Sequence, residues 1–221
     1  MSVADEALLQ GTARAEGADE GLVDRGRLLF LLGVFVLELL LFFGAMVVPI
    51  DPSTQQRLQQ AANSLQNSTT DRAPAAVLGL IFSNNVKVAL AEMIPGAGAF
   101  VFFISILNTG QVIQVLALSR GVPGIFYGVA LFLFPFSIVE LSAYALAVCS
   151  GSMLIVAWRR NRLRREAPVF VLELLGVVLI LLVAATMETI TLLLPEVGLA
   201  LWLPTGLLVA WLAITLRRAI R

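Results

Sequence analysis

The chain has 221 residues and a formal charge of zero; 59% of its residues are hydrophobic and only 14% are charged. Soluble domains carry about 25% charged residues, and here the apolar residues form runs of about 20, which is the length that crosses a bilayer. The composition therefore indicates an integral membrane protein. With no histidine and the single cysteine Cys149, it also excludes a serine–histidine triad, an HExxH zinc motif and an internal disulfide.

The first 26 residues contain six acids, are rich in glycine and alanine, and show no sustained apolar face. We expect an acidic, flexible tail over 1–26 and an integral membrane helical domain over 27–221. The zero net charge gives no reason to expect a nucleic-acid partner. We also expect no metal, no cofactor and no enzymatic activity.

Apolar runs predict an all-α, polytopic membrane helical bundle with about six transmembrane helices. At about 1.5 Å rise per residue, roughly 21 residues cover the hydrocarbon layer of about 30 Å. The predicted spans are 28–49, 74–94, 97–118, 134–158, 168–194 and 197–216.

Two segments between the spans have a distinct character. Residues 51–73 are polar and neutral, and Pro52 favours the start of a short helix that lies on the outer membrane face or contacts a partner. Residues 121–134 are too few to cross before Pro135 interrupts them. They form either a re-entrant half-helix or a kinked extension of the fourth span.

Arginine placement predicts the orientation of the chain. The loop 159–166 contains the cluster Arg159, Arg160, Arg162, Arg164 and Arg165. Since positive residues favour the cytoplasm, we expect a multi-pass protein of the cell membrane with both termini cytoplasmic. We interpret the cluster as a topology-setting loop rather than a nucleic-acid patch or an anionic-lipid switch; contact with lipid headgroups suits either interpretation.

Polar side chains inside the spans are the candidate functional residues. A charge at the bilayer centre costs roughly 2.5–3.5 kcal/mol, so intramembrane acids such as Glu38 must face protein or water. The candidate buried polar core or pathway comprises Asn84, Asn85, Lys87, Glu92, Asn108, Gln111, Pro135, Glu140, Glu173 and Glu188.

Helical spacing indicates which way these residues face. At about 100° per residue, the polar residues from Asn84 to Glu92 occupy one arc of about 160°, and we expect this arc to face the bundle. Glu140 shares its face with Ala143, Ala147 and Gly151, whose small side chains favour close helix packing. The polar groups then serve either to join helices or to line a path for ions or protons.

Three short segments carry recognisable motifs: FSNNVKVAL, LNTGQ and PFSIVELSA. They resemble the signatures of the stage II sporulation protein M family over about residues 28–216. The matching residues are Phe82, Asn85, Asn108, Gly110, Pro135, Ile138, Glu140, Leu141 and Ala143. Phe136 and Ser137 depart from the pattern, since the family usually has histidine and glycine there.

The resemblance implies a multi-span protein without known enzymatic activity, similar to a membrane anchor that assembles a cell-wall-remodelling complex. The first hypothesis is therefore a non-enzymatic membrane scaffold or assembly factor for an envelope complex. It would sit in the lipid bilayer as a homo-oligomer such as a dimer and bind an envelope-protein partner. The alternative is a channel or transporter for an ion or small solute through a polar path in the bundle.

Overall fold

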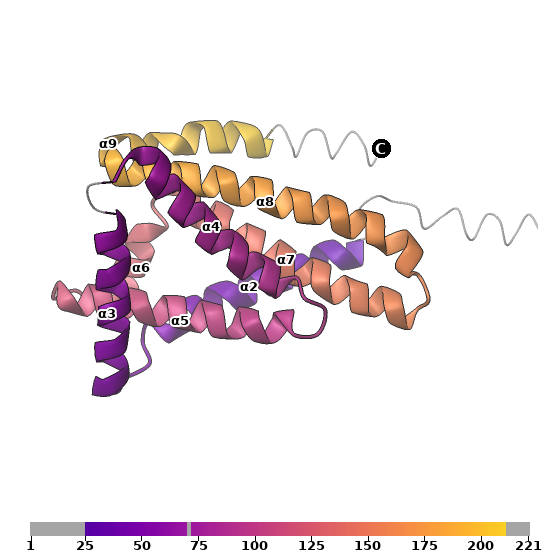
Figure 1. The fold of residues 1–221 in the computed structure, drawn as a ribbon, viewed down its shortest axis with the longest axis horizontal. Coiled ribbons are helices and arrows are strands. Elements are labelled where there is room, and N and C mark those ends of the chain that lie inside the picture. The colour runs from indigo at the N-terminus through magenta and orange to yellow at the C-terminus, as the bar shows by residue number, and fades with distance from the viewer. Residues whose placement is uncertain (1–24, 70–71, 211–221) are drawn as a thin grey trace, which may run out of the picture.

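The computed structural model describes residues 25–69 and 72–210 and shows a helical bundle, with no strand in these ranges (Figure 1). Five helices are long and apolar enough to cross a membrane: α2 (Arg25–Ala45), α4 (Pro74–Glu92), α5 (Gly98–Ser119), α7 (Pro135–Arg159) and α8 (Leu163–Leu193). The shorter elements are α3 (Pro52–Thr69), α6 (Gly124–Leu131), α9 (Pro195–Gly198) and the 3-10 turn η1 (Leu199–Leu201). The predicted all-α polytopic bundle is confirmed.

The predicted sixth span differs from the structure. A shorter apolar helix covers Pro195–Ala210, and residues 211–216 of the predicted span lie outside the described ranges, as does the acidic tail up to residue 24. At about 1.5 Å per residue, the described part reaches roughly 24 Å, less than the hydrocarbon layer of about 30 Å. The described chain therefore has five helices of spanning length.

Helix α7 is the centre of the bundle and contacts α2, α4, α5 and α8. Small side chains make this possible: Ala143, Ala145 and Ala147 are completely buried. Without bulky side chains, neighbouring backbones approach closely. A Cβ atom on Gly151, for example, would lie 2.6 Å from the carbonyl oxygen of Met93, just beyond α4.

A second close approach joins α2 to α5. A Cβ atom on Gly110 of α5 would lie 2.6 Å from the carbonyl oxygen of Phe42 and 2.7 Å from the Cβ of Ala45, both on α2. Phe42 and Ile106 belong to one buried apolar cluster at this crossing. The glycine therefore sets the distance between the two helices.

Helix α3 runs across the long helices near the ends of α4 and α8 (Figure 1). It begins at Pro52, after Asp51, whose carboxylate accepts hydrogen bonds from the Oγ of Ser53 at 2.6 Å and from the amide of Thr54 at 3.0 Å. These bonds hold the pKa of Asp51 below its usual value. Leu58 is buried, and α3 packs against α5 and α4.

The segment before Pro135 is a separate helix, α6, rather than a smooth extension of α7. Pro135 lacks an amide proton and forces its predecessor away from helical geometry, and Phe134 is extended with φ −105° and ψ 133°. Two side chains bond carbonyls at the break. The Ser137 hydroxyl donates to the Leu131 oxygen at 2.9 Å, and the Trp202 indole donates to the Leu133 oxygen at 2.6 Å.

The predicted arginine loop is a tight turn between α7 and α8. Asn161 adopts a left-handed conformation with φ 54°, and the amide of Arg162 donates to the Ala157 carbonyl at 2.8 Å; this arrangement ends a helix abruptly. Arg164 and Arg165 therefore lie in the first turn of α8 instead of in a loop. All five arginines of the cluster are exposed.

Gly110→Ala is expected to lower the free energy of unfolding by at least about 1 kcal/mol, because the added methyl group meets the Phe42 carbonyl and forces α2 and α5 apart. Unfolding of the purified protein in detergent, followed by circular dichroism, measures the change.

Gly176→Ala on α8 is the matched control. A Cβ atom there meets nothing within 4 Å, and alanine favours a helix over glycine by roughly 0.5–1 kcal/mol, so this variant is expected to be as stable as the original or more so. Equal stability of the two variants contradicts the close crossing at Gly110.

Candidate functional site

Four acidic side chains from four helices gather inside the bundle. We call Glu38 of α2, Glu92 of α4, Glu140 of α7 and Glu188 of α8 the glutamate cluster. Glu38 interacts electrostatically with Glu92 and Glu140, and Glu188 interacts with Glu140. The members of the cluster therefore come from helices that are far apart in the sequence.

Glu38 is the most enclosed member of the glutamate cluster. It lies on the same stripe of α2 as the buried residues Val34 and Phe42, four residues from each, which is the spacing of one helical face. The side chain is completely buried, and neither carboxylate oxygen has a hydrogen-bond partner. Buried polar groups without a partner are rare and costly, so this position calls for an explanation beyond packing.

Glu92 lies at the last residue of α4 and is 1% exposed. The turn between α4 and α5 brings Ser105 beside it, and the serine hydroxyl donates to Glu92 Oε1 at 2.7 Å. Glu92 Oε2 is buried without a partner. One oxygen of this carboxyl group is thus fixed while the other is unsatisfied.

Glu140 and Glu188 are half-buried. The Tyr144 hydroxyl, one helical turn along α7, donates to Glu140 Oε1 at 2.9 Å. Tyr144 also interacts electrostatically with Glu92 and Glu188. The phenol therefore lies among the acids of the cluster.

Between residues of the described ranges, the ion pairs that the structure defines join Arg27 to Glu166 and to Glu173, and neither includes a member of the glutamate cluster. Nor do histidine, cysteine and acidic side chains of residues 25–69 and 72–210 form a group of three able to hold a metal ion. Chemically, the arrangement offers buried and half-buried carboxyl groups that can bind protons.

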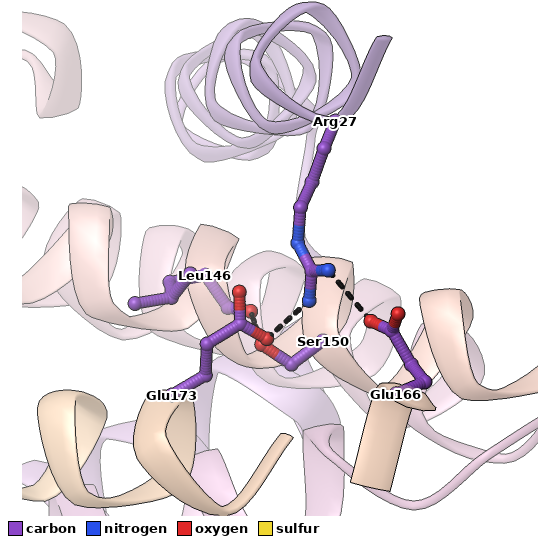
Figure 2. A network of polar contacts seen from close by, with 5 residues as sticks. All are labelled: Arg27, Leu146, Ser150, Glu166 and Glu173. Atoms are coloured by element: carbon purple, nitrogen blue, oxygen red, sulfur yellow. Dashed lines mark hydrogen bonds and ion pairs between the residues drawn. The ribbon is translucent and has the colours of Figure 1, made fainter. Parts of the chain in front are cut away.

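Arg27 joins the start of α2 to α8 (Figure 2). Its guanidinium donates to Glu166 at 2.6 Å and to Glu173 at 2.5 Å. The two acids are seven residues apart on α8, which places them on one face. Nearby in Figure 2, the Ser150 hydroxyl donates to the Leu146 carbonyl at 2.7 Å. Glu173 thus belongs to this ion-pair network, about 22 Å along α8 from Glu188.

The polar arc of α4 does not face the bundle as a whole. Asn85 is 6% exposed and Glu92 is buried, but Asn84 and Lys87 are exposed. The expectation that Asn84 and Lys87 face the interior of the bundle is therefore wrong for a single chain. The physical reason is the narrow contact: α4 buries only the stripe Val77, Asn85, Ala89 and Glu92. The polar arc of about 160° is wider than the face of α4 that the neighbouring helices bury.

Asn108 and Gln111 of α5 line a cavity of about 310 Å³ under α3, together with Arg57, and no member of the glutamate cluster lines this cavity. Asn108 is exposed and Gln111 is half-buried. The structure therefore does not gather all of the predicted polar residues along one path.

The remaining sequence-predicted residues lie at helix contacts. Pro135 is buried at the first position of α7. Ala143 and Ala147 pack with Ala89 of α4 and Leu181 of α8 in one apolar cluster, and Gly151 lies against Met93.

Arg27 and Ser105 are partners that the sequence analysis missed. Arg27 was not among the predicted site residues, and its acids are 139 and 146 residues away. One signal in the sequence could have indicated this pairing. Arg27 lies at the start of the first span, and Glu166 and Glu173 lie at the start of another span that begins on the same side of the membrane in the predicted topology.

Arg27→Met is expected to lower the free energy of unfolding by about 1–3 kcal/mol, because it leaves Glu166 and Glu173 without their charged donor. Arg25→Met, at an exposed position of the same helix, is the control and should leave the thermal unfolding curve unchanged. Identical curves for both variants would show that the Arg27 pairs contribute nothing.

Comparison with known proteins identifies the family of this chain. No curated protein and no solved structure matches it. A family model described as Stage II sporulation protein M matches residues 28–191, from α2 almost to the end of α8. This match covers well over half of the chain and includes every helix that contributes to the glutamate cluster. The protein therefore belongs to the stage II sporulation protein M family.

Proposed function

We propose that this chain is a non-enzymatic membrane scaffold that associates with a second copy of itself through α4 and assembles an envelope complex. The observation that carries the proposal is the exposed polar face of α4. Asn84 and Lys87 are exposed there, within a helix apolar enough to span the membrane. Polar groups at such positions are expensive to leave against lipid tails.

A second copy of α4 supplies partners for this face. Asn84 lies near the middle of α4, and a carboxamide both donates and accepts, so two Asn84 side chains can bond across a two-fold axis. Lys87 lies closer to the end of α4, and its long side chain can carry the ammonium group towards the headgroup level. Two lysines need not then meet at the helix crossing.

The rest of the chain supports a scaffold by its rigidity. Close contacts at Gly110 and Gly151 and the Arg27 pairs hold the bundle in one arrangement. The polar helix α3 and the exposed arginine turn are the described segments that an envelope-protein partner would contact.

Replacing Asn84 by leucine and Lys87 by methionine in one variant is expected to weaken self-association in lipid bilayers by about eightfold or more. Interhelical hydrogen bonds contribute about 0.6 and at most about 1.7 kcal/mol each, so the loss of two of them corresponds to a change of between about eightfold and about 300-fold. Single-molecule photobleaching at graded protein-to-lipid ratios measures the dimer fraction.

Thr186→Leu is the matched control, since it replaces an exposed polar residue on α8 without touching α4. It should leave the dimer fraction unchanged. An original chain that is monomeric at every ratio, or a double variant that dimerises as well as the control, rejects this mode of assembly.

The glutamate cluster favours a second candidate function, transport of protons or a small cation. Glu38 is completely buried with two unpartnered oxygens, and carboxyl groups inside a membrane are typical of ion and proton paths. No member of this cluster lines the cavity under α3, so the scaffold remains the first proposal.

If the chain transports protons or a monovalent cation, liposomes that contain it should show flux, and Glu140→Gln should lower that flux at least tenfold. The physical reason is the loss of the central titratable group, which interacts with both Glu38 and Glu188. Glu196→Gln, at an exposed position outside the cluster, is the control. Absence of flux from the original chain for every tested ion removes this candidate.

A further inference from the structure

The cavity between α3 and α5 has a composition that the scaffold function does not use. Its volume of about 310 Å³ is at the lower end of the range for small-ligand pockets. The lining residues are Thr54, Arg57, Leu58, Ala61, Asn108 and Gln111. Four of these six carry polar side chains, and the first four belong to α3 while the last two belong to α5.

The charge of the lining favours an anion. Arg57 is the only charged residue among the six, and no carboxylate lines the cavity. The Arg57 Nη2 atom donates to Thr54 Oγ1 at 3.0 Å, which holds one edge of the guanidinium while its planar fork offers further N–H donors. Asn108 and Gln111 add side-chain amide donors from the opposite wall. Such a set suits the oxygens of a phosphate group.

The position of the cavity favours a lipid as the source of that phosphate. Helix α3 lies across the spanning helices near the ends of α4 and α8 (Figure 1), as polar helices at the headgroup level of a membrane do. A ligand under α3 would therefore meet the bilayer edge.

One face of α5 leads from the cavity along the span. Asn108, Ile104 and Phe100 follow one another at four-residue spacing, which keeps them on one side of the helix. Ile104 is 50% exposed and Phe100 is 71% exposed, and about 12 Å of helix separates Phe100 from Asn108. This face offers an acyl chain a continuous apolar surface directly beyond the polar cavity.

We propose that the α3–α5 cavity binds the phosphate of a phospholipid headgroup, with Arg57 holding the phosphate, Asn108 and Gln111 bonding its oxygens, and an acyl chain lying along Ile104 and Phe100. The proposal is independent of self-association through α4. It assigns to α3 the recognition of lipid.

Native mass spectrometry of the purified full chain tests the proposal, with phosphatidylglycerol and a diacylglycerol of the same acyl chains as probes. Phosphatidylglycerol is expected to bind at least tenfold more tightly than diacylglycerol, and Arg57→Gln should remove most of this difference. Arg57 is exposed, so the variant should fold normally, which circular dichroism checks.

Arg72→Gln is the matched control, because it removes the same charge from an exposed arginine outside the cavity, and it should retain tenfold selectivity. Asn108→Ala should lower phosphatidylglycerol binding by a smaller factor than Arg57→Gln. Equal binding of the two lipids, or equal effects of Arg57→Gln and Arg72→Gln, overturns the proposal. Displacement of the lipid by millimolar inorganic phosphate also overturns it, because the site then recognises free phosphate.

Discussion

The hydrocarbon core of the membrane that surrounds the spanning helices imposes the constraint on which this structure depends. No water is present there to bond a polar group, so each polar side chain of a span needs a partner from protein or a place at the membrane edge. The chain meets this requirement in different ways at different positions. Arg27 forms ion pairs with two acids of α8, and one carboxylate oxygen of Glu92 accepts a hydrogen bond from the Ser105 hydroxyl.

Function is the natural explanation for a polar side chain of a span that is buried without a partner or exposed on the outer face of its helix. Glu38 is buried without a partner, while Asn84 and Lys87 are exposed on an apolar helix, although the Asn84 side chain donates one hydrogen bond to Asn85 at 3.4 Å. These are opposite situations. An enclosed acid points to a small occupant such as a proton, whereas an exposed amide and ammonium point to another helix. The two proposed functions therefore rest on different residues and can be separated by mutation.

Sequence periodicity and hydropathy predicted the fold well because the spanning helices are long and apolar, and three of the five begin at a proline or a glycine. The start of α3 at Pro52, the start of α7 at Pro135 and the turn before Gly98 follow from such local chemistry. The sixth span is the exception. Its hydropathy is high, but the apolar helix that begins at Pro195 is described only as far as Ala210.

The site was harder to predict because burial depends on which neighbours a helix meets. Glu38, Glu92 and Glu140 were recognisable as intramembrane acids, but their approach to one another depends on packing between helices far apart in the chain. For Lys87, helical spacing placed the residue on the same arc of α4 as Asn85 and Glu92 but could not show how much of that arc is buried. Helix α4 buries only a narrow stripe, and Lys87 lies outside it. The pairing of Arg27 with Glu166 and Glu173 spans more than 130 residues, beyond the reach of any local pattern.

The bond between the Trp202 indole and the Leu133 carbonyl has a consequence for biogenesis. The two residues are 69 positions apart, and synthesis proceeds from the amino terminus. Leu133 therefore leaves the ribosome well before the tryptophan that completes its hydrogen bonding. A chain truncated before residue 202 would contain all five long helices yet leave this carbonyl without its indole donor, so the break before Pro135 is completed only by a residue that follows all five.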